Sequence, residues 1–491
     1  MPRRIQTCLF SMVLFSLLAG CAINPVTGRR ELVLMSSERE AQLGAQTAAQ
    51  VAEEMGLVDS PALTAYVEEI GGRLARHSPR RDVVYRFAVV DMKEPNAFAL
   101  PGGYIYVSRG LLAIANSEAE LANVVGHEIG HVAARHSAQR ETRALGVGVL
   151  AALGTAAAGA IGGGGAAQGA AQIGQVAGAG FIASYGRDQE RQADDVGQGL
   201  AAQAGWDPAA MASFLNTLGR AAELQSGKPH QPSFLDSHPM TKERVRNTAI
   251  RADSLQVSPA APIAATRSAF YARLANLLIG TDPAEGFFRE ERFLHPGLGF
   301  ALDFPGGWKT ENSRTAVGAQ APGGDAVLVL QTQGESGDPG KAAQLFAQQN
   351  QLQLGEGKRE QIGGFPAYRT RAEFQTQQGP AVADLTWIAH PRATFRVLGI
   401  SPSGRFGDYA GIFRDVARSF RPLAQRERDG ITELRLRVAK ARKGESLAAL
   451  SRRTGNAWSL EETSVANDLP IEHRLRGGEP VKIAVEVPYR H

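Results

Sequence analysis

The sequence predicts an α+β protein: a mainly helical domain with a small sheet, then an α/β domain and a small C-terminal unit. A chain of 491 residues exceeds one ordinary core, so two or three domains are expected. Helix-start signals dominate residues 37–255, whereas residues 285–425 alternate strand-like runs with turns. The expected boundaries are a leader over 1–21, the helical domain over 22–255, a linker over 256–284, the α/β domain over 285–425, and the last unit over 430–491.

The composition is that of a folded protein with nearly balanced charge. Hydrophobic residues make up 43% and charged residues 21%, and 53 basic against 49 acidic residues give a net charge of +4. No basic block with interleaved aromatic residues occurs, so nucleic acid is not an expected partner. Both cysteines, Cys8 and Cys21, lie in the first 21 residues, so the body of the chain has no disulfide framework.

The N-terminus predicts membrane attachment. Arg3 and Arg4 precede an apolar run over 8–19 that is too short to span a bilayer comfortably. The run ends in Leu18-Ala19-Gly20-Cys21, which resembles the lipobox of bacterial lipoproteins, in which the leader is removed and the cysteine acylated. Ala22 stands where lipoproteins retained in the inner membrane often carry Asp. We therefore expect an outer-membrane lipoprotein that faces the periplasm, with Cys21 as its lipid anchor.

Local signals place the elements of the first domain in order. A helix is expected from Ser37, with Glu40 completing a capping box, and ends near residue 56. A second helix opens at Ser60-Pro61, a strand follows over 83–91, and two short strands flank Pro101-Gly102-Gly103. Ser117, with Glu120 three residues on, opens the helix that contains residues 127–131. A further helix is expected over 188–204.

Residues 144–186 contain no charged residue and consist mostly of Ala and Gly. Neither a Lys-Ser/Thr ending nor G-x-G-x-x-G spacing occurs, which excludes a phosphate-binding loop. The glycine content and the glutamines at 168, 172 and 175 argue against a transmembrane hairpin. Two interpretations stay open: small-residue helices and loops packed against the domain, or a lid or membrane-grazing flap over the active site.

The segment His127-Glu128-Ile129-Gly130-His131 predicts a zinc site on the helix that Ser117 caps. Residues four apart on a helix differ by about 40° in azimuth and about 6 Å in height, so both imidazoles can reach one ion. Glu128 lies beside them and can accept a proton from a zinc-activated water.

A catalytic zinc ion normally has three protein ligands, and Glu190 is expected to be the third. Asp194, four residues on, shares its helix face and can accept the N–H of a zinc-bound histidine. Asp195 is rotated by about 100° and is expected to be exposed. His136 comes five residues after His131, about 140° around a helix, and is expected to point away from the site.

These motifs, with the segment 96–104 and Ser237-His238-Pro239 followed by Arg244, resemble the M48 metallopeptidases. The likeness covers about 22–255 and implies a gluzincin-type fold with one Zn²⁺ per chain. The resemblance implies that His127, His131 and Glu190 bind the zinc, that Glu128 is the catalytic base, and that Arg244 lies close by. It leaves two roles for His238: polarising the substrate carbonyl, or binding zinc as a latch in the resting enzyme.

The expected function is that of a zinc metalloendopeptidase acting in protein quality control. The strand that begins with Asn96, Ala97 and Phe98 is expected to pair with an extended substrate through its main chain, which gives little sequence preference. Unfolded or misassembled envelope proteins are therefore the expected substrates. The alternative is an envelope chaperone, assembly scaffold or peptidoglycan-associated protein whose peptidase site is latched and rarely used.

The C-terminal half shows two weaker resemblances. The segment from Pro305-Gly306-Gly307-Trp308 to Ser419-Phe420-Arg421 resembles PsbP/Mog1-like α/β domains. Segments 443–447, 467–469 and 475–483 resemble a LysM module, a peptidoglycan-binding fold, which makes peptidoglycan a possible partner. His295, His390 and His473 are isolated from other catalytic residue types, and we expect them to be structural.

Overall fold

The structure, a computed structural model, describes residues 21–143, 184–225, 233–239, 241–376 and 379–490. The chain divides into two compact units, one formed by 1–279 with 435–485 and the other by 280–434 with 486–491. Within the described residues, no helix is both long and apolar enough to cross a bilayer. The predicted leader and most of the Ala/Gly-rich segment fall outside the described residues, at 1–20 and 144–183.

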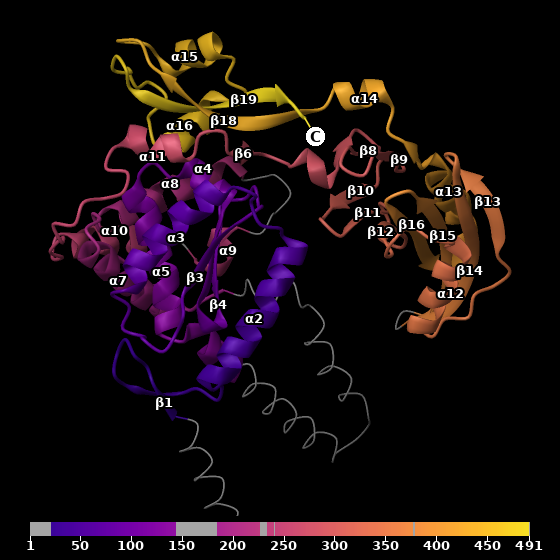
Figure 1. The fold of residues 1–491 in the computed structure, drawn as a ribbon, viewed down its shortest axis with the longest axis horizontal. Coiled ribbons are helices and arrows are strands. Elements are labelled where there is room, and N and C mark those ends of the chain that lie inside the picture. Colours follow the sequence, from indigo (N-terminus) through magenta and orange to yellow (C-terminus); the bar gives the residue numbers. More distant parts are fainter. Residues whose placement is uncertain (1–20, 144–183, 226–232, 240, 377–378, 491) are drawn as a thin grey trace, which may run out of the picture. The chain divides into compact units, whose positions relative to one another are not determined.

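The first unit is mainly helical, as the indigo and magenta ribbon of Figure 1 shows. Its elements up to residue 279 are β1 (Cys21–Ile23), β2 (Arg30–Leu32), α2 (Ser37–Glu54), α3 (Pro61–Ala75), β3 (Arg86–Val90), β4 (Ala97–Leu100), η1 (Pro101–Gly103), β5 (Tyr104–Ser108), α4 (Arg109–Ile114), α5 (Glu118–Ala133), α7 (Arg187–Gln203), α8 (Ala210–Gln225), α9 (Phe234–Ser237), α10 (Lys242–Ala252), α11 (Arg267–Arg273) and β6 (Leu278–Ile279).

A three-stranded sheet of order β3-β5-β4 packs beside α5. β3 pairs with β5 in parallel, and β4 pairs with β5 antiparallel. The two strands around Pro101 are confirmed: Gly102 and Gly103, with φ of 76° and 95°, take the left-handed conformation that the turn requires. β4 is therefore an edge strand of this sheet.

Side-chain caps fix where two of the helices begin. The predicted cap of α5 is confirmed, because Ser117 accepts a hydrogen bond from the backbone N–H of Glu120. The predicted start of α2 at Ser37 is confirmed, but the residue that caps it is Ser36. Glu40 does not complete a capping box; it is buried and paired with Arg80 at 2.5 Å and Arg135 at 2.8 Å. That network ties α2 to the end of α5.

The stretch predicted as a linker is bound to the first unit. The buried carboxylate of Glu118, at the start of α5, accepts the backbone N–H groups of Ile263 and Ala264 at 2.7 and 2.6 Å. It also accepts the side-chain protons of Tyr66 and Trp206, both at 2.7 Å. One carboxylate thus joins four segments of the chain at the N-terminus of α5.

The first unit also contains residues 435–485. They form a strand, two helices and a strand: β18 (Thr432–Lys440), α15 (Leu447–Thr454), α16 (Leu460–Ala466) and β19 (Pro480–Pro488). Lys482 of β19 is fully buried and donates to the backbone carbonyls of Ala113 and Ala115, at 2.8 and 2.6 Å, just before α5. The sequence-based boundaries and the LysM likeness stay predictions, but residues 435–485 pack within the first unit.

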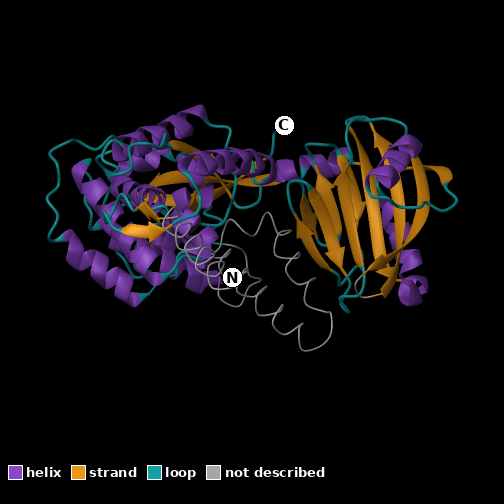
Figure 2. Ribbon diagram, turned by 90° about the horizontal axis from the view of Figure 1, so that it is seen from below, coloured by secondary structure: helices purple, strands orange, loops and turns teal. Residues whose placement is uncertain are grey.

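The second unit contains a seven-stranded antiparallel sheet of order β10-β11-β12-β16-β15-β14-β13, drawn in orange in Figure 2. A four-stranded sheet of order β17-β9-β8-β7 accompanies it. Trp387 and Ile388 of β15 face opposite sides of the large sheet, so α12 covers one face and α13 the other.

The bounds of these elements are η4 (Pro283–Glu285), β7 (Phe287–Arg289), β8 (Arg292–His295), β9 (Phe300–Asp303), β10 (Lys309–Asn312), β11 (Ala316–Gln320), β12 (Val327–Thr332), α12 (Pro339–Gln349), β13 (Lys358–Ile362), β14 (Phe365–Thr376), β15 (Gly379–His390), β16 (Ala393–Pro402), η5 (Ser403–Arg405), α13 (Phe406–Ser419), β17 (Arg421–Pro422) and α14 (Gln425–Asp429).

Candidate metal centre

Small residues bring α5 and α7 into direct backbone contact. A Cβ added at Gly197 of α7 would lie 2.6 Å from the backbone N of His127, and one added at Gly130 of α5 would lie 3.0 Å from Cα of Ala193. Such distances leave no room for a side chain, so the two helices approach as closely as their backbones allow. Glu190 of α7 thereby reaches the histidines of α5.

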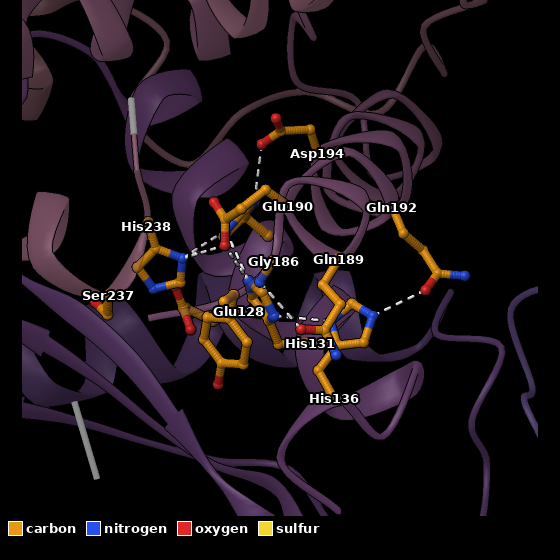
Figure 3. A network of polar contacts seen from close by, with 12 residues as sticks. Glu128, His131, His136, Gly186, Gln189, Glu190, Gln192, Asp194, Ser237 and His238 are labelled. Carbon is orange, nitrogen blue, oxygen red and sulfur yellow. Dashed lines mark hydrogen bonds and ion pairs between the residues drawn. The ribbon is translucent and has the colours of Figure 1, made fainter. Parts of the chain in front are cut away.

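Four side chains converge on one point, as Figure 3 shows for three of them. The Nε2 atoms of His127 and His131 are 3.0 Å apart, and His127 Nε2 is 3.1 Å from Nδ1 of His238. The Glu190 carboxylate lies 2.9 Å from His238 Nδ1 and 3.4 Å from His131 Nε2. All four ligand atoms lie within 4.8 Å of one another, and all four residues are buried.

The donor set fits a tetrahedral metal ion. Ligand atoms about 2.0–2.1 Å from zinc in a tetrahedron are separated by about 3.3 Å, which is close to the spacing found here. Three buried carboxylates, those of Glu128, Glu190 and Asp194, are opposed by one buried guanidinium, that of Arg244. With neutral imidazoles, a divalent cation would balance this charge.

The electrostatics of the ligands agree with a cation site. Burial acts to raise the pKa of Glu190, but its contacts with His238 and His131 outweigh burial and hold the pKa well below its ordinary value. Burial lowers the pKa of His131 well below its ordinary value. The carboxylate is therefore ionised and the His131 ring neutral, which are the forms that bind metal.

Glu128 is fully buried, and neither of its carboxylate oxygens has a hydrogen-bond partner. Burial raises the pKa of this carboxyl group. Its nearest charged or titratable neighbour among the described ion-pair contacts is Nε2 of His238, at 3.5 Å. A buried carboxylate without a hydrogen bond is costly for stability and typical of a group that exchanges protons with a reactant.

Asp194 and Arg244 support the ligands from outside. Oδ1 of Asp194 lies 2.9 Å from Nδ1 of His127, the ring nitrogen that faces away from the cluster. Arg244 donates to both carboxylate oxygens of Asp194, at 2.7 and 2.8 Å, and lies 2.6 Å from Glu190 Oε2. It also donates to the carbonyl of Pro239 at 3.3 Å, which holds the segment that carries His238. Asp195 is exposed, as predicted.

The expectation that His136 points away from the site is wrong. Its Nδ1 lies 2.8 Å from Nδ1 of His131, and its Nε2 lies 2.8 Å from Oε1 of Gln192. The helical azimuth does not apply because α5 ends at Ala133 and Arg135, with a φ of 59°, leaves the helical conformation before helix resumes at residue 136. Burial lowers the pKa of His136 to about 4, so the ring is neutral near pH 7.

Two aromatic residues of the site were missed by the sequence analysis. Tyr185 stacks on His131 with ring centroids 3.8 Å apart, and Phe234 stacks on His238 at 4.2 Å. Tyr185 also donates its backbone N–H to the carbonyl of Ser237. Tyr185 ends the apolar Ala/Gly-rich run, so its aromatic ring beside the charged start of α7 was the only available signal.

The predicted substrate strand lies beside the site but is covered. Ala97 and Phe98 belong to edge strand β4, which Asn96 precedes, and all three residues are buried. The backbone N–H of Phe234 donates to the carbonyl of Pro95, so α9 also contacts the start of this strand. Cys21 begins β1, and its side chain is outside what the structure describes.

Comparisons with known proteins place these features in one family. Residues 61–251 match Peptidase family M48. Metalloprotease LoiP of Escherichia coli (strain K12) is 30% identical over 257 residues, which cover 50% of this chain and 95% of that protein. Mitochondrial metalloendopeptidase OMA1 of Schizosaccharomyces pombe is 30% identical over 226 residues, covering 45% of this chain and 64% of that protein.

The beta-barrel assembly-enhancing protease of Escherichia coli (strain K12) is 31% identical over 230 residues. The match covers 45% of this chain, and the chain spans only 45% of the length of that relative.

Proposed function

This chain belongs to peptidase family M48, and from that membership we propose that it is a zinc-dependent endopeptidase of the bacterial cell envelope. The observation that carries the proposal is the convergence of His127, His131, Glu190 and His238 beside the Glu128 carboxylate, which has no hydrogen bond. Three ligands, a fourth position that can admit water, and a base are what metal-assisted peptide hydrolysis needs.

In the active form, His127, His131 and Glu190 would hold one Zn²⁺. When bound, zinc supplies Lewis-acid chemistry: it acidifies the attacking water and stabilises negative charge on the carbonyl oxygen. Asp194 fixes the tautomer of His127 by accepting a hydrogen bond from its Nδ1–H. Arg244 holds the carboxylates of Asp194 and Glu190 in position. Neither needs to touch the substrate.

Glu128 would act as the general base and then as the general acid. It accepts the proton of the attacking water and returns it to the leaving amine. Burial without a hydrogen-bond partner raises its pKa, which brings its basicity closer to that needed near neutral pH.

His238 would act as a latch in the state described here. Its Nδ1 lies among the ligand atoms, which is where a fourth ligand would sit in place of water. Its Nε2 faces Glu128 at 3.5 Å, so the ring separates the base from the metal site. Because α9 also contacts the start of β4, withdrawal of this segment would free both the fourth position and the substrate strand.

Unfolded or misassembled envelope proteins are the proposed substrates. The relative from Escherichia coli is named for enhancing beta-barrel assembly, and pairing along β4 would read main chain rather than side chains. The proposed place of action is the periplasmic face of the outer membrane, with the anchor at Cys21.

A second candidate is an envelope chaperone or assembly scaffold whose peptidase site stays latched. The position of His238 and the burial of β4 favour it, because both block substrate entry in this state.

Casein cleavage by the chain from residue 21, carrying Cys21→Ser, and by its His238→Ala variant tests the two candidates. The peptidase proposal predicts chelator-sensitive cleavage that zinc restores, and faster cleavage by His238→Ala. Zinc binding without cleavage by either protein would favour the scaffold.

A further inference from the structure

The chain that follows Cys21 folds into a hairpin with two unlike faces. β1 and β2 pair with Cys21 opposite Leu32, Ala22 opposite Glu31 and Ile23 opposite Arg30. The turn between the strands is closed by Asn24, whose side chain accepts the N–H of Val26 at 2.9 Å. Beyond β2, burial continues to alternate residue by residue as far as Met35.

One face of the hairpin is bound to the peptidase domain. Glu31 accepts from Gln139 at 2.5 Å, and Gln139 in turn accepts from Gln189 at 3.0 Å. Gln189 lies in the first turn of α7, next to the proposed ligand Glu190. Val33 and Met35 are buried against Ala138. This face is therefore fixed relative to the metal centre.

The other face is apolar, basic and uncovered. Ile23, Leu32 and Leu34 are 61%, 48% and 56% exposed. Arg30 shares this face, because it pairs with Ile23, and Arg29 precedes it in the turn. Neither arginine forms an ion pair within the described part of the chain. Only nine large apolar residues are exposed in the described residues, and three of them gather on this one face.

We propose that the outward face of the hairpin, formed by Ile23, Arg30, Leu32 and Leu34, rests in the headgroup region of the bilayer to which Cys21 is attached. The inference depends on the anchoring proposed for Cys21 above. No spacer separates that residue from the fold, since Cys21 itself is the register partner of Leu32. An acylated residue at this position holds the neighbouring face at the membrane surface.

The chemistry of the face suits that partner. Apolar side chains flanked by arginine partition into the boundary between headgroups and acyl chains, where the guanidinium meets anionic phosphate. In Figure 1, β1 lies at one end of the first unit, and the sheet that contains β19 lies at the other end. Because the inner face is bonded to α7 through Gln139, membrane contact would set a fixed height of the metal centre above the bilayer.

Vesicle co-sedimentation of the unacylated chain, residues 21–491 with Cys21→Ser, tests the proposal. Vesicles of phosphatidylethanolamine and phosphatidylglycerol are compared with vesicles of phosphatidylcholine. We expect the parent to bind more strongly to the vesicles that contain phosphatidylglycerol. The double variant Leu32→Ser/Leu34→Ser should partition about tenfold or more weakly than the parent. The Arg30→Gln variant should bind both kinds of vesicle equally, because it lacks the charge that prefers anionic lipid. Leu345→Ser, at a residue 57% exposed in the second unit, is the matched control and should bind as the parent does.

Equal partitioning of the parent and the double variant would overturn the proposal, as would absence of binding by the parent. A parent that dimerises without vesicles, and a double variant that stays monomeric, would assign the face to a second copy of the chain and overturn it too. Casein cleavage measured on the same samples separates this outcome from failure of the proposed peptidase, because no substituted residue lies in the metal centre.

Discussion

Nδ1 of His136 lies 2.8 Å from Nδ1 of His131, so the second of the two proposed ligand histidines is oriented by another histidine and not by a carboxylate. His127 has Asp194 in the corresponding place. If His131 binds the metal through Nε2, its Nδ1 would carry the proton and donate it to His136. His136 then donates from Nε2 to Gln192, which fixes the tautomer of both rings.

Replacement of His136, or of the Gln192 side chain that holds it, should weaken zinc binding. We expect His136→Phe and Gln192→Leu to lower zinc affinity about tenfold to a hundredfold, because the first removes the group that orients His131 and the second removes the group that orients His136. Affinity is measured by competition with a chromophoric chelator. Gln203→Leu, on an exposed position of the same helix, is the control. His136→Gln keeps an acceptor and should recover part of the affinity, whereas affinity equal to the parent's in all variants would contradict the assignment.

Arg244→Gln should also reduce zinc affinity, by about tenfold to a hundredfold. The substitution removes the guanidinium that holds Asp194 through two hydrogen bonds and contacts Glu190. Arg246→Gln is the matched control, since Arg246 is exposed on the same helix. The same chelator competition measures zinc affinity for both variants. Equal losses of affinity would show that zinc binding depends on the overall charge and not on the contacts of Arg244.

The close backbone contact between α5 and α7 should tolerate no side chain at Gly197. A methyl group there would sit 2.6 Å from the backbone of His127, so Gly197→Ala should cost about 1–3 kcal/mol of stability and also lower zinc affinity. Gly199→Ala, two residues on, meets no atom within 4 Å and should be neutral or slightly stabilising. Urea denaturation measures both. A Gly197→Ala protein as stable as Gly199→Ala would refute the close approach.

Lys482→Met should destabilise the first unit by about 2–4 kcal/mol, because two buried carbonyls before α5 lose their donor. Lys443→Met, at an exposed position of the same C-terminal segment, should change stability little. Urea denaturation followed by tryptophan fluorescence compares them. If both variants unfold at the same urea concentration as the parent, residues 435–485 do not stabilise the rest of the first unit.

The sequence was most informative where function depends on local spacing. His127, Glu128 and His131 lie on one capped helix, so their proximity follows from helix geometry alone. The motif around Glu190 predicts that this residue lies near the two histidines. The physical reason, the close contact of α7 with α5 at Gly197, is a tertiary contact that the motif does not reveal.

Contacts between distant segments were not predictable. Arg135 interrupts the helix with a φ of 59°, and no local sequence signal marks that break, so the position of His136 does not follow from helix geometry. Lys482 reaches Ala113 across 369 residues, and a lysine in a strand gives no indication that it will be buried. The hydrogen bonds from the backbone of residues 263–264 to Glu118 were not predictable either, because they also join distant segments.

The most direct test of the account compares zinc content and casein cleavage for the Cys21→Ser chain and its Glu128→Gln variant, each also made with His238→Ala to release the latch. We predict one zinc per chain in every protein, and cleavage only where Glu128 is retained. Cleavage at the parent rate by the Glu128→Gln proteins would contradict the central claim that this carboxylate is the catalytic base.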